Sequence, residues 1–140
     1  MRKHVRFNME EIKCIMYQIF DGLRYLHDMN VFHRDIKDGN ILVTKDGVVK
    51  ICDFGLARFF MKEDGSIPYS DNKITMCYRP PEILLGYCNY DSKIDIWSAG
   101  CILLNLLKQN IFIQGDDRKT VFESILELFG SRTAFCILSI

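Results

Sequence analysis

The sequence predicts an α+β fold that is mainly α-helical, in one domain covering residues 1–140. Three stretches have helical patterns, at residues 9–29, 92–107 and 117–129, and two short apolar runs flank a turn at residues 45–47. With 140 residues, of which 49% are hydrophobic, the chain is long enough to bury a core. We therefore expect several packed helices and one small β-hairpin.

Residues 9–29 are the first expected helix. Apolar residues that recur three and four positions apart share one helix face, and here they are Ile12, Ile15, Met16, Ile19, Leu23 and Leu26. Asn8, with Glu11 three residues later, resembles a capping box at the helix start. Asp28 and Asn30 are expected to end the helix.

A β-hairpin is expected next, with strands in residues 41–44 and 48–52 and with Asp46-Gly47 as its turn. Its two strands would bring Asn40 and Asp53 to the same end of the hairpin. Residues 56–75 lose any periodic pattern and include turn-forming residues at 63–66. A loop is therefore expected in that stretch.

Residues 92–107 are apolar on nearly every side of the expected helix, which predicts a buried helix. Asp95 lies within it, and two interpretations stay open. It could be a buried carboxylate that must be hydrogen-bonded or paired, or an exposed acid that the dipole favours in the first turn. A further amphipathic helix is expected at 117–129, and Gly130 ends it.

Composition narrows the classes of protein and partner. The formal net charge is zero, and no apolar run approaches the roughly 18 residues of a membrane-spanning helix. Neither a nucleic acid nor a membrane is therefore expected as a partner. The basic start lacks the apolar core of a signal peptide, which favours an intracellular protein. The six cysteines form no CxxC pair, so buried reduced thiols are expected.

Polar residues on both sides of the expected hairpin have the types that phosphoryl transfer requires. That reaction needs an acid at the attacking hydroxyl, oxygen ligands for Mg²⁺ and a cation at the transferred group. Asp35 could supply the acid and Lys37 the cation. Asn40 and Asp53 could supply the oxygen ligands. Singly, each could be a turn former or a helix cap, but the pattern as a whole favours catalysis.

These motifs resemble the protein kinase family. His33-Arg34-Asp35, with Asn40 five residues after the Asp, matches its catalytic loop, and Asp53-Phe54-Gly55 matches its metal-binding loop. The stretch at 75–86, which contains Arg79-Pro80-Pro81-Glu82, is most similar to cyclin-dependent kinases of the transcriptional branch. One departure is Cys77, where that family usually has Trp. The resemblance implies a Ser/Thr kinase, directed to sites followed by proline, that uses ATP and Mg²⁺ and acts on protein substrates.

The resemblance also assigns catalytic and cofactor-binding roles. Asp35 would be the base, and Lys37 would clamp the phosphate. Asn40 and Asp53 would be the Mg²⁺ ligands. Thr75 aligns with the threonine that hydrogen-bonds the catalytic Asp and Lys.

Further roles implied by the resemblance concern the nucleotide and regulation. Leu42 aligns with the side chain beneath the adenine, although it could simply be hairpin core. Ser70 falls where the family carries its activating phosphothreonine, with Arg34 and Arg58 as phosphate partners. An ordinary loop hydroxyl is the alternative for Ser70. Ile74 aligns with the residue that shapes the pocket for a following proline.

Two more residues have structural roles in the family. The resemblance places His33 in a packing spine with Phe54, as a structural imidazole and not a base. It also makes Asp95 an anchor for backbone amides of the catalytic loop, which is one of the two interpretations left open above.

The resemblance covers roughly residues 5–130 and implies only part of a kinase domain, the large lobe (C-lobe). No Gly-rich phosphate loop and no strand lysine precede the catalytic loop, so the small lobe is expected to be absent, as are the terminal helices. Residues 131–140 form a divergent tail. Glu82 would then lack its usual arginine partner. We expect weak nucleotide binding and little or no turnover, because positioning supplies most of the catalysis in this reaction class.

The sequence leaves two functions open. One is a cyclin-dependent-kinase-like Ser/Thr kinase, in the nucleus rather than the cytoplasm. The alternative is a catalytically inactive kinase fragment that acts as a protein-binding module through residues 56–90 and 116–130. A cyclin or a full-length kinase is a further candidate partner.

Overall fold

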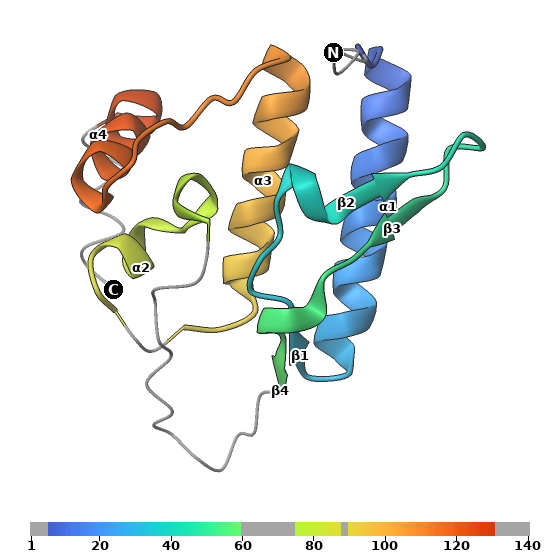
Figure 1. The fold of residues 1–140 in the computed structure, drawn as a ribbon, viewed down its shortest axis with the longest axis horizontal. Helices are drawn as coiled ribbons and strands as arrows, with labels where there is room; N and C mark the ends of the chain where they lie inside the picture. The colour runs from blue at the N-terminus through green and yellow to red at the C-terminus, as the bar shows by residue number, and fades with distance from the viewer. Residues whose placement is uncertain (1–5, 60–74, 88–89, 131–140) are drawn as a thin grey trace.

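A computed structural model of the chain describes residues 6–59, 75–87 and 90–130 (Figure 1). Two long helices, α1 (Met9–Asp28) and α3 (Lys93–Lys108), pack side by side. A hairpin of β2 (Ile41–Val43) and β3 (Val49–Ile51) lies against α1. On the other side of α3 are the short α2 (Pro81–Leu84) and α4 (Arg118–Phe129), which contact each other. The expected helix-rich fold with small sheets is confirmed.

Helix α1 has the expected start and the expected apolar face. The side chain of Asn8 accepts a hydrogen bond from the Glu11 amide (2.9 Å), and the Glu11 carboxylate accepts one from the Asn8 amide (2.8 Å). This capping box satisfies two amides that have no partner within the helix. Residues of the predicted face are buried against α3 and the hairpin: Ile12, Ile15, Met16, Ile19 and Leu23.

The hairpin is attached to α1 by one polar side chain. Gln18 donates to the carbonyl of Gly47 (2.9 Å) and accepts from the amide of Val49 (3.0 Å). Gly47 has φ +78°, which glycine adopts without strain. Strand β3 also packs closely against α1 at Gly22, because a Cβ on that residue would lie 3.1 Å from Ile51 Cδ1. The antiparallel register pairs Ile41 with Ile51.

A second small sheet corrects the sequence expectation. Strand β1 (Val31–Phe32) pairs antiparallel with β4 (Arg58–Phe59), so the loop expected at 56–75 is wrong at its start. Strands of two residues leave no alternation for a sequence pattern to detect. A 3₁₀ turn, η2 (Phe54–Leu56), leads into β4, and residues 60–74 lie outside the described part.

Helix α3 is buried on one face and not all round. Ile94, Asp95 and Ile102 are buried, whereas Ile96 and Leu107 are each 43% exposed. Within the described residues the expectation of a fully buried helix is therefore wrong for its outer face. Helix α4 starts at a capping carboxylate, Asp117, which accepts hydrogen bonds from the amides of residues 119 and 120.

Four cysteines lie in the described part, and none of these forms a disulfide. Cys101 is buried, and burial raises the pKa of its thiol to about 12, so it stays protonated. Cys52 and Cys77 are half-buried, while Cys14 is exposed, which corrects the expectation for that residue. No helix among the described residues is long and apolar enough to cross a bilayer.

Replacing Gln18 with alanine should loosen the hairpin. The Gln18→Ala variant leaves the Val49 amide and the Gly47 carbonyl without their side-chain partner, and we expect a loss of about 1 kcal/mol in the free energy of unfolding. Thermal melting and amide hydrogen exchange of residues 43–51 would measure it. Tyr17→Ala, a control on the exposed face of the same helix (Tyr17 is 74% exposed), should leave hairpin exchange unchanged. Equal exchange in both variants would contradict this attachment.

Candidate active site

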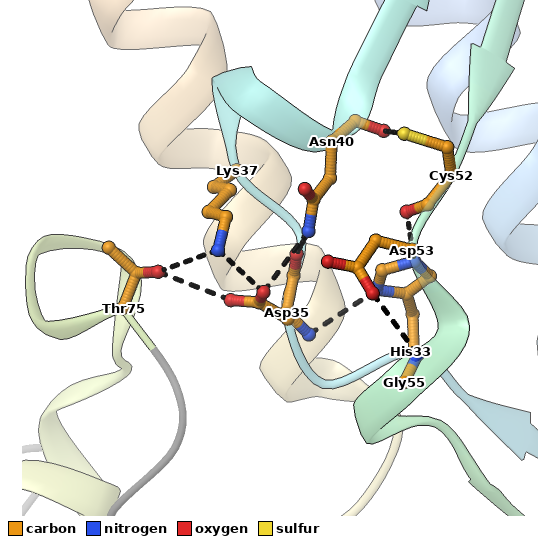
Figure 2. A network of polar contacts seen from close by, with 8 residues as sticks. All are labelled: His33, Asp35, Lys37, Asn40, Cys52, Asp53, Gly55 and Thr75. Atoms are coloured by element: carbon orange, nitrogen blue, oxygen red, sulfur yellow. Dashed lines mark hydrogen bonds and ion pairs between the residues drawn. The ribbon is translucent and has the colours of Figure 1, made fainter.

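Three other predicted residues, Lys37, Asn40 and Thr75, meet around the carboxylate of Asp35 (Figure 2). Lys37 Nζ donates to Asp35 Oδ2 (2.6 Å) and to Thr75 Oγ1 (3.1 Å). The Thr75 hydroxyl donates to Asp35 Oδ1 (3.2 Å), and Asn40 Nδ2 donates to Asp35 Oδ2 (3.1 Å). Thr75 comes from a segment forty residues away in the chain, so only the fold can assemble this group, which we call the Asp35 cluster.

The Asp35 cluster leaves room for one more donor. A carboxylate has about four acceptor positions, and the cluster fills three of them with Lys37, Asn40 and Thr75. Asp35 itself is only 5% exposed, so water does not compete freely for the remaining position. A substrate hydroxyl could donate its proton there, as a general base requires.

Asn40 and Asp53 lie at the same end of the hairpin, as expected (Figure 2). The Cys52 amide donates to the Asn40 carbonyl (2.9 Å), which fixes the two segments side by side. The Asn40 NH₂ group is used on Asp35, so its amide oxygen is free to act as a ligand. Asp53 is exposed, with one carboxylate oxygen receiving the Gly55 amide at 3.3 Å.

This pair fits Mg²⁺. That ion takes one or two protein oxygens and fills its remaining positions with water and phosphate. Among residues 6–59, 75–87 and 90–130 no group of three or more His, Cys, Asp or Glu is arranged to hold a metal. Gly55 leaves space for the Asp53 carboxylate, because a Cβ on Gly55 would lie only 3.1 Å from Asp53 Oδ1. Asp53 also has φ +64°, a conformation that non-glycine residues adopt only at some energetic cost.

His33 is structural, as the sequence predicted. It is completely buried, with Nε2 donating to the Cys52 carbonyl (3.0 Å) and Nδ1 accepting from the Asp35 amide (3.3 Å). This pattern requires the neutral imidazole, because one ring nitrogen donates and the other accepts. Its ring packs edge-on against Phe54, with centroids 4.8 Å apart.

Asp95 anchors the 33–40 loop from helix α3. It is 1% exposed, and its two oxygens accept the amides of His33 (2.9 Å) and Arg34 (2.8 Å). The interpretation of Asp95 as an exposed first-turn acid is therefore wrong. His27 Nε2 lies 2.9 Å from Asp95 Oδ2, a contact that sequence reasoning missed. The signal was present, since His27 follows the buried Leu23 by one helical turn.

Three further residues predicted for nucleotide binding and regulation lie in the described part of the chain. Leu42 is 52% exposed on β2, so its interpretation as hairpin core is wrong. Arg58 lies on β4 and pairs with Phe32 of β1. Phe32 precedes the buried Arg34 by two residues. Ser70 and Ile74 lie outside the described residues.

Glu82 is half-buried, and no ion pair to it is found within the described ranges. Burial, together with the neighbouring charge of Asp91, raises the pKa of its carboxyl. The charged form is therefore less stable in the folded chain than in the unfolded one.

The carboxyl of Glu82 should make stability fall as pH rises. Because its pKa is higher in the folded state, the folded chain binds more protons, and the free energy of unfolding decreases above the ordinary carboxyl range. We expect Glu82→Gln to be more stable than the wild type near pH 7 and nearly equal near pH 4. Melts at both pH values would test this, with Glu127→Gln, an exposed acid of α4, as control. A lower melting temperature for Glu82→Gln at neutral pH would contradict it.

Removing the Asp95 carboxylate should destabilise the whole site. Asp95→Ala leaves two buried amides without acceptors, at about 1–3 kcal/mol each, so we expect a loss of at least about 2 kcal/mol. Denaturant unfolding measures it. Asp28→Ala, whose side chain is 68% exposed, is the control and should change stability little. A loss no larger than that of the control would show that Asp95 is not an anchor.

Comparisons with known proteins agree with this geometry. A family model described as "Protein kinase domain" matches residues 1–135. Cyclin-dependent kinase 9 of Homo sapiens is 42% identical over 131 residues, 92% of this chain and 35% of that protein. Cyclin-dependent kinase 9-A of Xenopus laevis is 42% identical over 132 residues, 93% of this chain and 35% of that protein. Cyclin-dependent kinase 12 of Drosophila melanogaster is 46% identical over 127 residues, 91% of this chain and 11% of that protein.

A solved structure is also similar. A chain in the crystal structure of the yeast RNA Pol II CTD kinase CTDK-1 complex superposes with a TM-score of 0.82 and 40% sequence identity, covering 89% of this chain and 40% of that one. This chain thus spans about a third of the cyclin-dependent kinase 9 proteins it matches, 35% of their length. The family match over residues 1–135, together with the Asp35 cluster, shows that the chain belongs to the protein kinase family.

Proposed function

We propose that this chain forms the central part of the large lobe of a cyclin-dependent-kinase-like Ser/Thr kinase. The proposed reaction transfers the γ-phosphate of ATP to a Ser or Thr hydroxyl of a protein, at sites followed by proline. The observation that carries the proposal is the Asp35 cluster, in which Lys37 and Thr75 converge on one buried carboxylate. Asn40 and Asp53 lie beside it (Figure 2).

The chain's own residues would act as follows. Asp35 accepts the proton of the substrate hydroxyl. The hydroxyl oxygen then attacks the γ-phosphorus, while the bond from this phosphorus to the bridging oxygen of ADP breaks and ADP leaves. Lys37, held between Asp35 and Thr75, offers its positive charge to the transferred phosphoryl group. Asn40 and Asp53 would hold Mg²⁺, which neutralises phosphate charge when bound.

Leu42 would form the floor under the adenine. Its exposure of 52% on β2 supports this proposal, since an apolar side chain on that face could cover an aromatic base. We also propose Ser70 as a phosphorylation site paired with Arg34 and Arg58. The support is that β4 holds Arg58 opposite Phe32, close in the chain to Arg34.

The partners and the cellular location that we propose are inferred from the names of the similar proteins. Several matched proteins are named as cyclin-dependent kinases, and the yeast complex is named as an RNA Pol II CTD kinase. We therefore propose a cyclin partner, a substrate in the transcription machinery and a nuclear location. These matches do not favour the alternative of an inactive binding module.

The proposal predicts Mg²⁺-dependent nucleotide binding that needs Asp53. A thermal melt of the chain with Mg-ATP should shift upward by several degrees, because a ligand that binds only the folded state stabilises it. Asp53→Asn should remove most of the shift. Asp46→Asn, an exposed acid in the hairpin turn, is the charge-matched control and should keep it.

Phosphorylation of a Ser-Pro peptide would test the chemistry. Asp35→Asn should reduce the rate by about 10²–10⁴, the usual contribution of a general base. If Asp35→Asn and Asp53→Asn both phosphorylate the peptide at the wild-type rate, the proposed mechanism is wrong. A cooperative melt with no nucleotide shift would revive the binding-module alternative.

A further inference from the structure

Asp38, Tyr78 and Asn105 form a closed ring of hydrogen bonds beside the Asp35 cluster. The Tyr78 hydroxyl donates to Asp38 Oδ2 (2.9 Å). Asn105 Nδ2 donates to the same oxygen (3.1 Å) and to the Tyr78 hydroxyl (3.2 Å). Asn105 Oδ1 accepts from the Phe112 amide (2.9 Å), which determines the orientation of the amide group. Every polar hydrogen in the ring therefore has an acceptor.

Tyr78 is held at both ends. Its side chain is part of the core, with only 6% of the residue exposed, and its carbonyl accepts from the Ser98 hydroxyl (2.8 Å). Burial, and then the charge of Asp38, raise the pKa of the Tyr78 hydroxyl, so it keeps its proton and can donate. A buried hydroxyl without its acceptor would be costly, which ties the position of Tyr78 to that of Asp38.

The ring joins three segments that matter to the site. Asp38 directly follows Lys37 in the 33–40 loop, and Tyr78 follows Thr75 by three residues. Asn105 lies on α3, ten residues after Asp95, or about 15 Å along a helix. Helix α3 thus holds the start of the 33–40 loop through Asp95 and the end of the loop through Asn105.

We propose that Asp38 is a positioning residue, whose hydrogen bonds to Tyr78 and Asn105 set the spacing between the 33–40 loop and the segment starting at Thr75. Through this spacing it aligns Asp35 with the substrate hydroxyl. The last step rests on the proposed kinase function. The side-chain hydrogen bonds of Asp38 go to Tyr78 and Asn105 and not to Asn40, Asp53 or Leu42, so its effect should fall mainly on the chemical step rather than on nucleotide binding.

Because Asp38 is exposed, its effect on the reaction rate can be distinguished from an effect on the stability of the fold. Asp38 is exposed and lines a cavity of about 630 Å³ together with Asn105, so water can replace part of its bonding when the ring is broken. Tyr78→Phe removes the buried hydroxyl together with its hydrogen bonds and leaves the exposed Asp38 to water, so this variant should change overall stability little. It should still move Thr75 relative to Asp35, and misplacements of about 1 Å can cost about 100-fold in rate.

The kinetic test uses the full chain with Mg-ATP and a Ser-Pro peptide. Asp38→Ala and Tyr78→Phe should each lower kcat at least about tenfold, with KM for ATP changed less than about twofold. Asp38→Asn keeps an acceptor oxygen and should recover most of the rate. The double variant should be little worse than either single one, because both remove the same ring.

Two matched controls lie outside the ring. Tyr25→Phe removes a hydroxyl from a tyrosine that is 65% exposed on α1, and Asp46→Asn removes an exposed carboxylate. Both should leave kcat unchanged. A kcat in Asp38→Ala or Tyr78→Phe equal to that of the controls, or additive losses in the double variant, would overturn the proposal.

Hydrogen exchange keeps this inference distinguishable from the kinase proposal. If the wild type phosphorylates nothing, the proposed function fails, and exchange of the free chain then decides the inference. Tyr78→Phe should speed exchange in residues 36–40 and in 75–79 together by about fivefold or more, with α1 unchanged. Faster exchange in only one segment, or in neither, would overturn the coupling.

Discussion

The buried carboxylate of Asp95 is the interaction on which the geometry of the site depends. It accepts the amides of His33 and Arg34 inside the protein, where no water could replace it. Arg34 has φ +70°, a conformation that costs energy for a residue with a side chain. The hydrogen bonds to Asp95 offset this cost, and the bend at Arg34 turns the next residue, Asp35, toward Lys37 and Thr75.

Helix α3 acts as the rigid support for this arrangement. Its inner face is packed against α1, and its polar residues Asp95 and Asn105 reach the two ends of the 33–40 loop. The loop can therefore present charged side chains close together without relying on its own few residues for stability. The site follows the common design in which loops carry the reacting groups and packed helices fix their positions.

Local chemistry explains how much could be predicted. The α1 capping box, the Asp46-Gly47 turn and the end of α4 at Gly130 are set by neighbouring residues, and each was correct. Residue types alone suggested Asp35, Lys37 and Asn40, but Thr75 was added to this group only through the resemblance to kinases, since nothing local links it to Asp35. The β1–β4 pair, the contact of His27 with Asp95 and the ring around Asp38 were missed. These join residues far apart in the chain and leave no periodic pattern.

Amide hydrogen exchange at His33 and Arg34 in the ligand-free chain tests the central claim most directly. If Asp95 preassembles the site, these two amides should exchange as slowly as those in the buried middle of α3, which open only on global unfolding. Exchange as fast as in the exposed hairpin turn at residues 45–47 would contradict the account, because the loop would then not be held by α3 before any ligand binds.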